Sequence, residues 1–396
     1  MKILHLATDD KFIDYALPLF EAASPQSNSV FVYAGKTPLR FVGTDPERIV
    51  KKRPIHCLFR ARLSSEVYRH FDLFVFHSLH DLLYSELANI PRHAPKIWLG
   101  WGFDYYEDFL DQPLYLPETR RLRQKAMRSG GPISKTYNLI RAGIERAFQR
   151  GRRRAVEEMT LFSPVVPSEY QRVKEGRNWR RFPTYCQWNY GTLEDSFIRK
   201  IDVDPPLGNA VLVGNSATYS NNHVEAFQLL TRATEASRRV IAPLSYGEPG
   251  VSKEIERIGR DLLGQRFKPL NEFLPIEKYL ENIGQCGYAI MNHRRQQAVG
   301  NIVIMLYLGA RVFVREESPV NSFLTKLGAN FSTVQALEAN PDLISLPLSD
   351  RERKRNKDVV ASYWSRPAAM ARTVRLLKKA ASASAELRPP TGGPNP

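Results

Sequence analysis

The chain alternates short apolar runs with longer amphipathic segments along most of its length. The apolar runs are rich in β-branched and aromatic residues and predict strands at 2–7, 29–34, 72–77, 96–100, 160–166, 210–213, 239–243, 267–270, 288–291 and 311–314. Several intervening segments repeat apolar residues at helical spacing, as in Asp14–Ala22 and Lys253–Leu263. Strands that alternate with helices are typical of α/β domains with parallel sheets.

The most informative segment combines a strand, a polar turn and a helix within residues 209–230. The predicted strand Ala210–Val213 runs directly into Gly214–Ser216, and a helix with Val224 and Phe227 on one face follows. Open α/β sheets bind ligands where a strand ends and a helix begins, because backbone N–H groups and the helix dipole favour an anion there. An ordinary βα turn is the alternative, since this turn is neither a Walker loop nor a GxGxxG pattern.

A second segment of the same kind follows the strand at 288–291. A polar loop, His293–Gln297, precedes an apolar helix over Ile302–Leu308. Right-handed connections place both loops at one edge of the sheet, where arginines suit a diphosphate and amides suit sugar hydroxyls. Solvated loop arginines are the alternative. With a third loop after the strand at 239–243, the predicted donor-binding residues are Gly214, Asn215, Ser216, Asn222, His223, Leu244, Tyr246, Arg294, Arg295, Gln296, Gln297, Gly300 and Asn301.

Several short segments, in order along the chain, resemble glycosyltransferase family 56, the TDP-N-acetylfucosamine:lipid II N-acetylfucosaminyltransferases of bacterial surface glycan synthesis. They are FVFHS, WGFDYYE, FPT, VLVGNSAxxxNNHVEAF, APLSYG and RRQQAVGNI, within about residues 70–325. The resemblance implies a GT-B fold, with two Rossmann-like domains whose parallel sheets face a central cleft. It also implies a TDP-sugar donor and a polyprenyl-diphosphate-linked saccharide acceptor. A 4-acetamido-4,6-dideoxygalactose-like sugar is the expected donor sugar, and enterobacterial common antigen or O-antigen is the expected product class.

The first half of the chain is then expected to bind the acceptor. The segment after the strand at 96–100 contains aromatic rings able to stack on sugars and a carboxylate, Asp104, able to accept a proton. Asp104 is predicted to be catalytic, as a base or as an orienter of the acceptor hydroxyl, and a helix cap is the alternative. His77, at the end of the strand at 72–77, is a second catalytic candidate, although a lone histidine is more often structural. The predicted acceptor-binding residues are Trp101, Gly102, Tyr105 and Tyr106.

Charge adds a prediction about the membrane. The 396 residues include 57 Lys and Arg against 41 Asp and Glu, a net charge of +16. The surplus is strongest over 120–154, where Glu145 is the sole acid and residues 135–150 have apolar positions at helical spacing. Such a basic amphipathic helix predicts peripheral binding to an anionic membrane surface, at the cytoplasmic face of the bacterial inner membrane. A solvated helix packed on the domain is the alternative.

Composition predicts two domains. We expect an acceptor-binding domain at 1–197, a linker at 198–209 and a nucleotide-sugar-binding domain at 210–350. A helix at 351–380 should cross back to the first domain, and the tail 381–396 should be disordered. The sequence begins without the pattern of a signal peptide and contains no apolar run long enough to span a membrane.

Other functions remain as alternatives. The charge alone would suit a nucleic-acid-binding protein, but no RRM, KH or zinc pattern is present, so we expect no nucleic-acid partner. A non-catalytic scaffold that binds a sugar nucleotide is a further alternative. The chain's three cysteines lack metal-ligand spacing, and the letters DVD at 202–204 fall in the predicted linker rather than at a strand end. We therefore predict a metal-independent hexosyltransferase that is fucosyltransferase-like and uses no cofactor.

Overall fold

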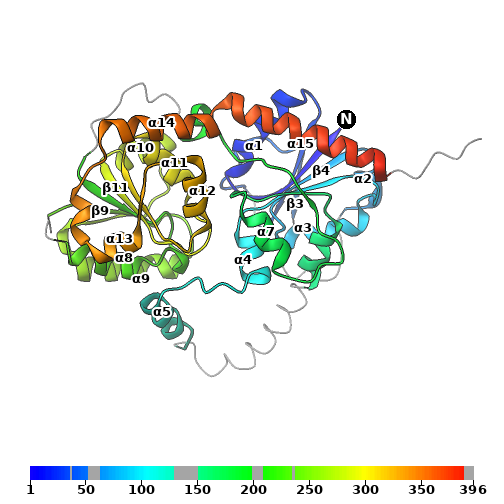
Figure 1. Ribbon diagram of the computed structural model, residues 1–396. Helices are drawn as coiled ribbons and strands as arrows, with labels where there is room; N and C mark the ends of the chain where they lie inside the picture. Colours follow the sequence, from blue (N-terminus) through cyan, green and yellow to red (C-terminus); the bar gives the residue numbers. More distant parts are fainter. Residues whose placement is uncertain (36–37, 52–62, 129–149, 199–207, 234–236, 388–396) are drawn as a thin grey trace, which may run out of the picture. The chain divides into compact units, whose positions relative to one another are not determined.

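The computed structural model describes residues 1–35, 38–51, 63–128, 150–198, 208–233 and 237–387. The chain divides into two compact units, and each is described on its own (Figure 1). The first unit comprises Met1–Asp111, Ile133–Thr192 and Arg366–Pro396, and the second comprises Gln112–Pro132 and Leu193–Ser365. The predicted helix at 135–150, most of the predicted linker and the DVD letters lie outside the described residues.

The first unit contains a seven-stranded parallel sheet in the order β3-β2-β1-β4-β5-β6-β7. Its strands are β1 (Ile3–Thr8), β2 (Asn28–Ala34), β3 (Arg48–Lys51), β4 (Leu73–His77), β5 (Lys96–Leu99), β6 (Leu161–Ser163) and β7 (Thr184–Tyr185). Its helices include α1 (Phe12–Ala23), α2 (Ser65–Tyr68), α3 (Asp81–Tyr84), α4 (Phe103–Phe109), α7 (Glu169–Glu175) and α15 (Arg366–Leu387). The central strands β1, β4 and β5 are almost entirely buried, as their apolar sequences require.

The helix α15 completes the core of the first unit from the far end of the sequence (Figure 1). Its buried apolar side chains, at Ala369, Leu376, Leu377 and Ala380, recur at helical spacing and pack in one cluster with Phe20 of α1. Two hydrogen bonds add to this packing: Trp188 Nε1 donates to Thr373 Oγ1 at 2.9 Å, and Arg372 Nε donates to Asn189 Oδ1 at 2.8 Å.

The second unit contains a six-stranded parallel sheet in the order β10-β9-β8-β11-β12-β13. Its strands are β8 (Ala210–Val213), β9 (Val240–Pro243), β10 (Phe267–Leu270), β11 (Cys286–Met291), β12 (Arg311–Val314) and β13 (Ser332–Thr333). Its helices are α5 (Pro117–Arg128), α8 (His223–Thr231), α9 (Pro249–Leu263), α10 (Ile276–Ile283), α11 (Val299–Tyr307), α12 (Pro319–Leu327), α13 (Val334–Ala339) and α14 (Asp350–Trp364) among the described residues.

The predicted α/β class and the predicted strands are confirmed. Three predicted boundaries differ: those of one strand, one helix and the tail. The strand at 160–166 ends at Ser163, because Pro164 has no N–H for a sheet ladder. The helix at 351–380 is two helices, because Pro367 cannot donate to the carbonyl of Tyr363 and Ser365 is extended between them. The tail from 381 continues as helix to Leu387, and only its remainder lies outside the described residues.

The segment 112–128 also differs from the sequence prediction, because it belongs to the second unit. Thr119 donates from N and from Oγ1 to the Glu225 carboxylate at 2.9 and 2.6 Å, so α5 packs on α8. Leu116 N donates to Asn222 Oδ1 at 2.8 Å. These contacts join residues more than a hundred positions apart, and local composition carries no sign of them.

Candidate active site

In each sheet the strand order reverses at one place, and open α/β sheets bind ligands at such a place. In the second unit the reversal lies between the neighbouring strands β8 and β11. The two predicted donor loops, residues 214–222 and 292–298, follow these two strands. In the first unit the reversal lies between β1 and β4, which are followed by residues 9–11 and 78–80.

Gly214 forms the turn out of β8. Its φ of 68° lies in the left-handed region, and an added Cβ would lie 2.6 Å from Asn221 Oδ1 and 2.7 Å from His223 Nε2. Glycine is therefore required at this position for both its conformation and its size. Gly214 N donates to Ile290 O at 3.1 Å, which fixes the turn against the end of β11.

Side-chain amides join the two loops. Gln297 Nε2 donates to Asn215 Oδ1 at 3.0 Å and to Ser216 Oγ at 3.3 Å, and Ser220 Oγ donates to Gln297 Oε1 at 2.7 Å. Asn221 Nδ2 donates to Ser216 O at 2.9 Å. The structure thus brings together the predicted residues Asn215, Ser216 and Gln297, and it adds Ser220 and Asn221, which the sequence analysis passed over.

Asn222 and Asn292 make a second junction between the same loops. Each donates from Nδ2 to the carbonyl oxygen of the other, at 2.9 and 3.0 Å. Arg315 Nε donates to Asn292 Oδ1 at 2.7 Å. Asn222 also has a left-handed φ of 50°, a conformation that asparagine tolerates better than most residues. Its amide is therefore used to hold the loops together.

The arginines of the second loop differ in their partners. Arg294 Nε lies 3.6 Å from Glu317 Oε1. Arg295 Nε donates to Gln297 Oε1 at 2.9 Å, and no carboxylate of the described residues lies within ion-pair distance of it. The helix α11 begins at Val299, directly after this loop, with no side-chain cap on its N-terminus. Arg295 and the N-terminus of α11 are therefore the groups best suited to bind an anion.

Two histidines lie beneath the loops. His293 Nε2 lies 2.8 Å from Asn221 Oδ1, and burial lowers the pKa of His293 well below its usual value. His223 opens α8, and neither of its ring nitrogens has a hydrogen-bond partner among the described residues. Burial lowers the pKa of His223 to about 3, so its imidazole is neutral at physiological pH. The predicted donor-binding role of His223 stays a prediction.

The remaining predicted donor-binding residues have mixed surroundings. The Leu244 side chain packs inside the apolar core, so its predicted donor-binding role would fall to its backbone. Tyr246 is 43% exposed at the end of β9, where a ring could stack. Asn301 Nδ2 donates to Tyr279 Oη at 2.8 Å, and Gly300 faces Phe197. Gln296 is buried.

In the first unit, Asp104 is buried and accepts three hydrogen bonds. Its Oδ2 accepts from Leu79 N at 3.0 Å and from Trp98 Nε1 at 2.7 Å, and its Oδ1 accepts from Trp101 N at 2.9 Å. Burial raises the pKa of Asp104, and these hydrogen bonds oppose that shift. The helix-cap alternative is wrong, because Gly102 is the N-cap of α4. What Asp104 does is hold the turns that follow β4 and β5.

Tyr105 and Tyr106 were predicted to bind the acceptor, and this prediction is wrong. Both rings are buried, with exposures of 0% and 1%. Both hydroxyls donate to the Glu169 carboxylate, Tyr105 at 2.6 Å. Burial raises the pKa of Glu169 to about 7, against the opposing effect of the two tyrosines. These rings are core residues because α4 turns its aromatic face toward β5 and β6.

A different set of rings lies at this edge. Trp101 is half-buried, and its ring contacts those of Phe12, Phe103 and Tyr190 with centroids 5.1, 6.0 and 5.8 Å away. Phe103 is 42% exposed. The sequence analysis named Trp101 and Gly102 but missed the other three rings. Only Phe103 carried a local signal, as the exposed third residue of the WGF segment.

His77 is fully buried, which excludes the direct contact with a substrate that a catalytic role needs. Its Nε2 lies 2.9 Å from His5 Nδ1, and its Nδ1 lies 3.0 Å from Tyr190 Oη. The following residue, Ser78, has a left-handed φ of 71° and a buried Oγ without a hydrogen-bond partner among the described residues. Strain and an unsatisfied hydroxyl at a strand end are typical of functional sites.

Asp10 was also missed, although it is the second residue after β1, at the place where the strand order reverses. It accepts a hydrogen bond from Phe12 N at 3.1 Å. The Phe12 ring in turn contacts the Trp101 ring, with centroids 5.1 Å apart, so the Asp10 carboxylate is bonded to a residue of this ring cluster. The strand-end rule applied to the first strand could have found it.

Solved structures with a similar architecture include several glycosyltransferases. The chain is similar to trehalose 6-phosphate synthase from Burkholderia multivorans, with a TM-score of 0.61 and 12% identity over 98% of this chain and 100% of that chain. It is also similar to sucrose-phosphate synthase from Thermosynechococcus elongatus, with a TM-score of 0.61 and 10% identity over 97% of this chain and 100% of that chain. The similarity to Anabaena HepE in complex with UDP and glucose has a TM-score of 0.60 and 13% identity over 96% of this chain and 99% of that chain. These likenesses identify the fold as GT-B.

A sequence model of the 4-alpha-L-fucosyltransferase glycosyl transferase group 56 matches residues 171–337. The matched residues include the turn after β8, the loop after β9 and the loop between β11 and α11. They therefore contain every predicted donor-binding residue. The family resemblance is confirmed over this range, and the chain is a glycosyltransferase with a GT-B fold.

Proposed function

We propose that the enzyme transfers a 4-acetamido-4,6-dideoxygalactose-like sugar from a TDP-sugar to a polyprenyl-diphosphate-linked saccharide in bacterial surface glycan synthesis. The observation that carries this proposal is the group 56 match over 171–337, which covers the joined loops of the second unit. The second unit then binds the donor and the first unit binds the acceptor.

The donor diphosphate is assigned to Arg295, the N-terminus of α11 and the turn at Gly214. Backbone N–H groups and a guanidinium stabilise the negative charge that develops on the departing nucleoside diphosphate. Fixed dipoles serve this purpose well because they need no reorganisation during the reaction. The amide network of Gln297 and Asn215 supports this assignment, since it fixes both loops before a ligand binds.

In the reaction, an acceptor hydroxyl oxygen forms a bond to the anomeric carbon, and the bond from that carbon to the diphosphate oxygen breaks. The hydroxyl proton goes to a base, and the electron pair of the broken bond leaves with TDP. Asp10 is proposed as this base, because it lies at the strand reversal and accepts a hydrogen bond from Phe12, whose ring contacts the Trp101 ring. Asp104 is proposed to help orient the acceptor, because its three hydrogen bonds fix the backbone that carries Trp101.

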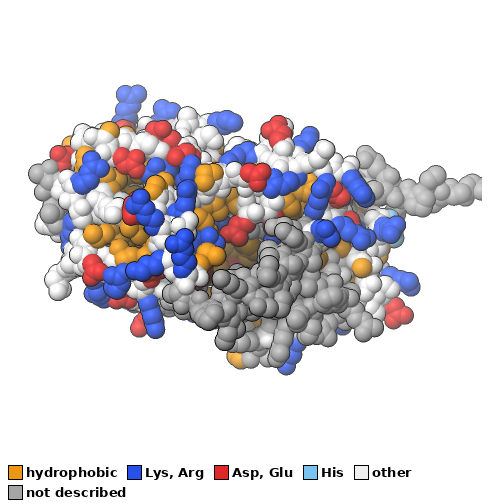
Figure 2. All heavy atoms as spheres, turned by 90° about the horizontal axis from the view of Figure 1, so that it is seen from below, with side chains coloured by type: hydrophobic (Ala, Val, Ile, Leu, Met, Phe, Trp, Pro, Cys, Tyr) orange, Lys and Arg blue, Asp and Glu red, His pale blue; other side chains and the backbone are white. Residues whose placement is uncertain are grey.

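The proposed location is the cytoplasmic face of the inner membrane, with peripheral attachment to anionic lipid. The part of the basic segment that the structure describes includes α5, where Arg120, Lys125 and Arg128 are exposed and Met127 is 63% exposed. Figure 2 looks at the side on which α5 lies in Figure 1, and blue Lys and Arg side chains are prominent there. Among the described residues, none of the helices combines the length and apolar character needed to cross a membrane.

A panel of nucleotides tests the proposed donor. TDP, UDP and GDP would each be added to the enzyme, and its melting temperature would be measured. A nucleotide present well above its Kd raises the melting temperature by mass action. The proposal predicts the largest rise with TDP, and TDP-sugar turnover with a polyprenyl-diphosphate-linked disaccharide as acceptor. A larger rise with UDP or GDP would contradict the TDP assignment.

A further inference from the structure

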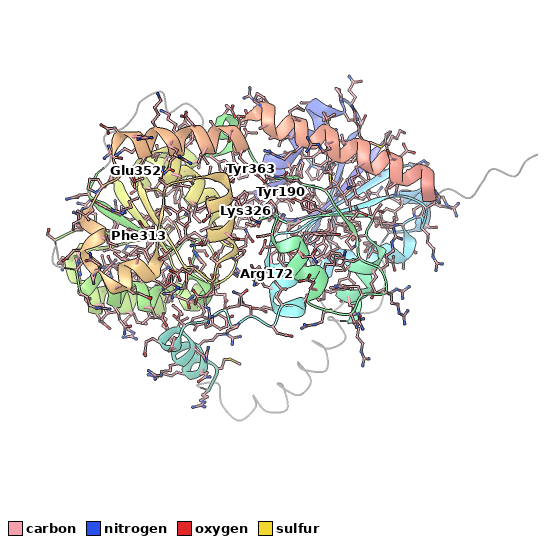
Figure 3. All side chains as sticks on the ribbon, in the orientation of Figure 1. Arg172, Tyr190, Phe313, Lys326, Glu352 and Tyr363 are labelled. Atoms are coloured by element: carbon pink, nitrogen blue, oxygen red, sulfur yellow. The ribbon has the colours of Figure 1, made fainter. Side chains whose placement is uncertain are left out.

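A chain of hydrogen bonds runs through the first unit from Asn28, at the start of β2, to Tyr190. His5 Nε2 lies 3.2 Å from Asn28 Oδ1, His5 Nδ1 lies 2.9 Å from His77 Nε2, and His77 Nδ1 lies 3.0 Å from Tyr190 Oη. Both histidines are fully buried, and Tyr190 is labelled in Figure 3. The chain thus links the amino end of the sheet to the ring cluster at its carboxyl end.

The surroundings of Asn28 set the direction of this chain. Its Nδ2 donates to Glu21 Oε2 at 2.8 Å and to Ser24 O at 2.9 Å, so its Oδ1 is the acceptor that faces His5. His5 must then carry its proton on Nε2 and accept on Nδ1. A neutral imidazole has one N–H, so each step fixes the next.

The same argument extends along the chain to Tyr190. His77 donates from Nε2 to His5, which leaves its Nδ1 as an acceptor. The Tyr190 hydroxyl donates its proton to that nitrogen and turns only lone pairs toward its other neighbours. Burial lowers the pKa of His5 to about 4 and the pKa of His77 well below its usual value, so both rings are neutral at physiological pH.

The neighbour that needs an acceptor is Trp101. Its indole Nε1 is buried and has no hydrogen bond of ordinary geometry to a described residue. Burial raises the pKa of Tyr190 well above its usual value, and the Trp101 side chain, as a donor beside the Tyr190 hydroxyl, opposes that shift. In the opposite direction of the chain, the Tyr190 oxygen would already accept from His77 Nδ1 and would turn its own O–H toward its other neighbours, so it would be a poorer acceptor for the indole N–H. The direction inferred from the Asn28 amide leaves both free lone pairs of the Tyr190 oxygen for the indole N–H.

We propose that Asn28, His5, His77 and Tyr190 are positioning residues that orient the Trp101 ring for stacking on the acceptor saccharide. The proposal rests on the proposed function in one respect, the binding of a saccharide by the first unit. It explains why two buried histidines lie behind an aromatic cluster, and it identifies Trp101 as the ring that contacts sugar. Phe103, the exposed neighbour of Trp101, would extend the same surface.

The first test examines the chain of hydrogen bonds in the absence of substrate. Nitrogen-15 spectra of the histidine rings should show both His5 and His77 protonated on Nε2. The Trp101 indole N–H resonance should shift in Tyr190→Phe and in Asn28→Ala. Tyr170→Phe is the matched control, because the Tyr170 hydroxyl donates to Pro183 O outside the chain. An Nδ1-protonated histidine, or an indole resonance unchanged in both variants, would overturn the proposal.

The second test measures the kinetics of sugar transfer to a polyprenyl-diphosphate-linked disaccharide. In Tyr190→Phe the KM for this acceptor should rise about three- to tenfold, which is the range for one neutral hydrogen bond, while the KM for the TDP-sugar stays unchanged. A KM for the acceptor equal to that of Tyr170→Phe would contradict the role in acceptor binding. If the wild type transfers no sugar, the proposed function fails, and the ring and indole resonances still decide the role of the chain in orienting Trp101.

Discussion

The carboxyl edges of the two sheets use polar side chains in different ways. In the second unit, amides such as Gln297 and Asn215 bond across two loops, and Arg295 is left without a carboxylate among the described residues. In the first unit, Asp104 and Glu169 accept hydrogen bonds inside the protein. The polar side chains of the second unit's edge therefore join two loops, whereas those of the first unit's edge hold that unit's own core.

This difference explains where sequence reasoning works. A polar residue in a loop at a strand end has few uses in a core, so Asn215 and Gln297 could be assigned to one site from the sequence. Aromatic rings have a strong alternative, because a core buries them at least as well as a ligand does. Tyr105 and Tyr106 are buried in the core in this way.

The largest effect is expected for the two aspartates of the first unit. Asp10→Asn removes the proposed base and should lower kcat by about 10²–10⁴-fold, the usual contribution of general-base catalysis. Its melting temperature should change little, since asparagine can still accept from Phe12 N. Turnover near that of the wild type would remove Asp10 from the mechanism.

Asp104→Asn is the matched comparison for Asp10→Asn. Here the amide would place an N–H against one of three existing donors, so we expect a loss of about 2–3 kcal/mol in the free energy of unfolding. Urea unfolding measures this loss. An unchanged stability would mean that the Asp104 carboxylate is not the fixed acceptor described above.

Glu169 gives the first unit a dependence on pH. Its folded-state pKa of about 7 lies above the unfolded value near 4.5 because the carboxyl is buried. The folded state therefore binds the proton more tightly, and this group's contribution to stability falls as pH rises from about 4.5 to 7. Glu169→Gln removes the titration, so from pH 5 to 8 its stability relative to the wild type should rise by about 3 kcal/mol. A constant difference between the two proteins across this range would contradict the raised pKa.

The two arginines of the loop between β11 and α11, Arg294 and Arg295, test the proposed donor site of the second unit. Arg295→Ala should weaken TDP binding by about 1.5–3 kcal/mol, the value of a hydrogen bond to a charged group. Arg294→Ala should have a smaller effect, because Arg294 lies 3.6 Å from Glu317. Arg257→Ala, on the exposed face of α9 where it pairs with Asp261, is the control. Equal and unchanged binding in all three variants would show that the loop arginines are solvated.

The smallest effects concern the membrane. Lys125→Ala with Arg128→Ala should weaken binding to anionic vesicles by about 1 kcal/mol per charge, and salt should weaken it further. Arg257→Ala with Arg260→Ala removes the same charge from α9 and should leave vesicle sedimentation unchanged. Equal losses in both pairs would mean that net charge, rather than α5, directs the binding.

Several features could not be predicted from the sequence because they depend on partners distant along the chain. Asn222 looked like a ligand-binding residue, yet its amide bonds to Asn292 and to the 114–116 segment. The edge strands β3, β7 and β13 are too short or too polar to form an apolar run. In contrast, the helix break before Pro367 is predictable from the sequence, because proline has no N–H to donate inside a helix.

The central claim is that the second unit holds the donor diphosphate between the turn at Gly214 and the N-terminus of α11. A crystal structure of the enzyme with TDP tests it most directly. The account predicts both phosphates at this edge, with backbone N–H groups at 299–301 and the Arg295 guanidinium within hydrogen-bond distance of phosphate oxygens. TDP bound elsewhere, with Arg295 still bonded to Gln297 and no phosphate near α11, would contradict it.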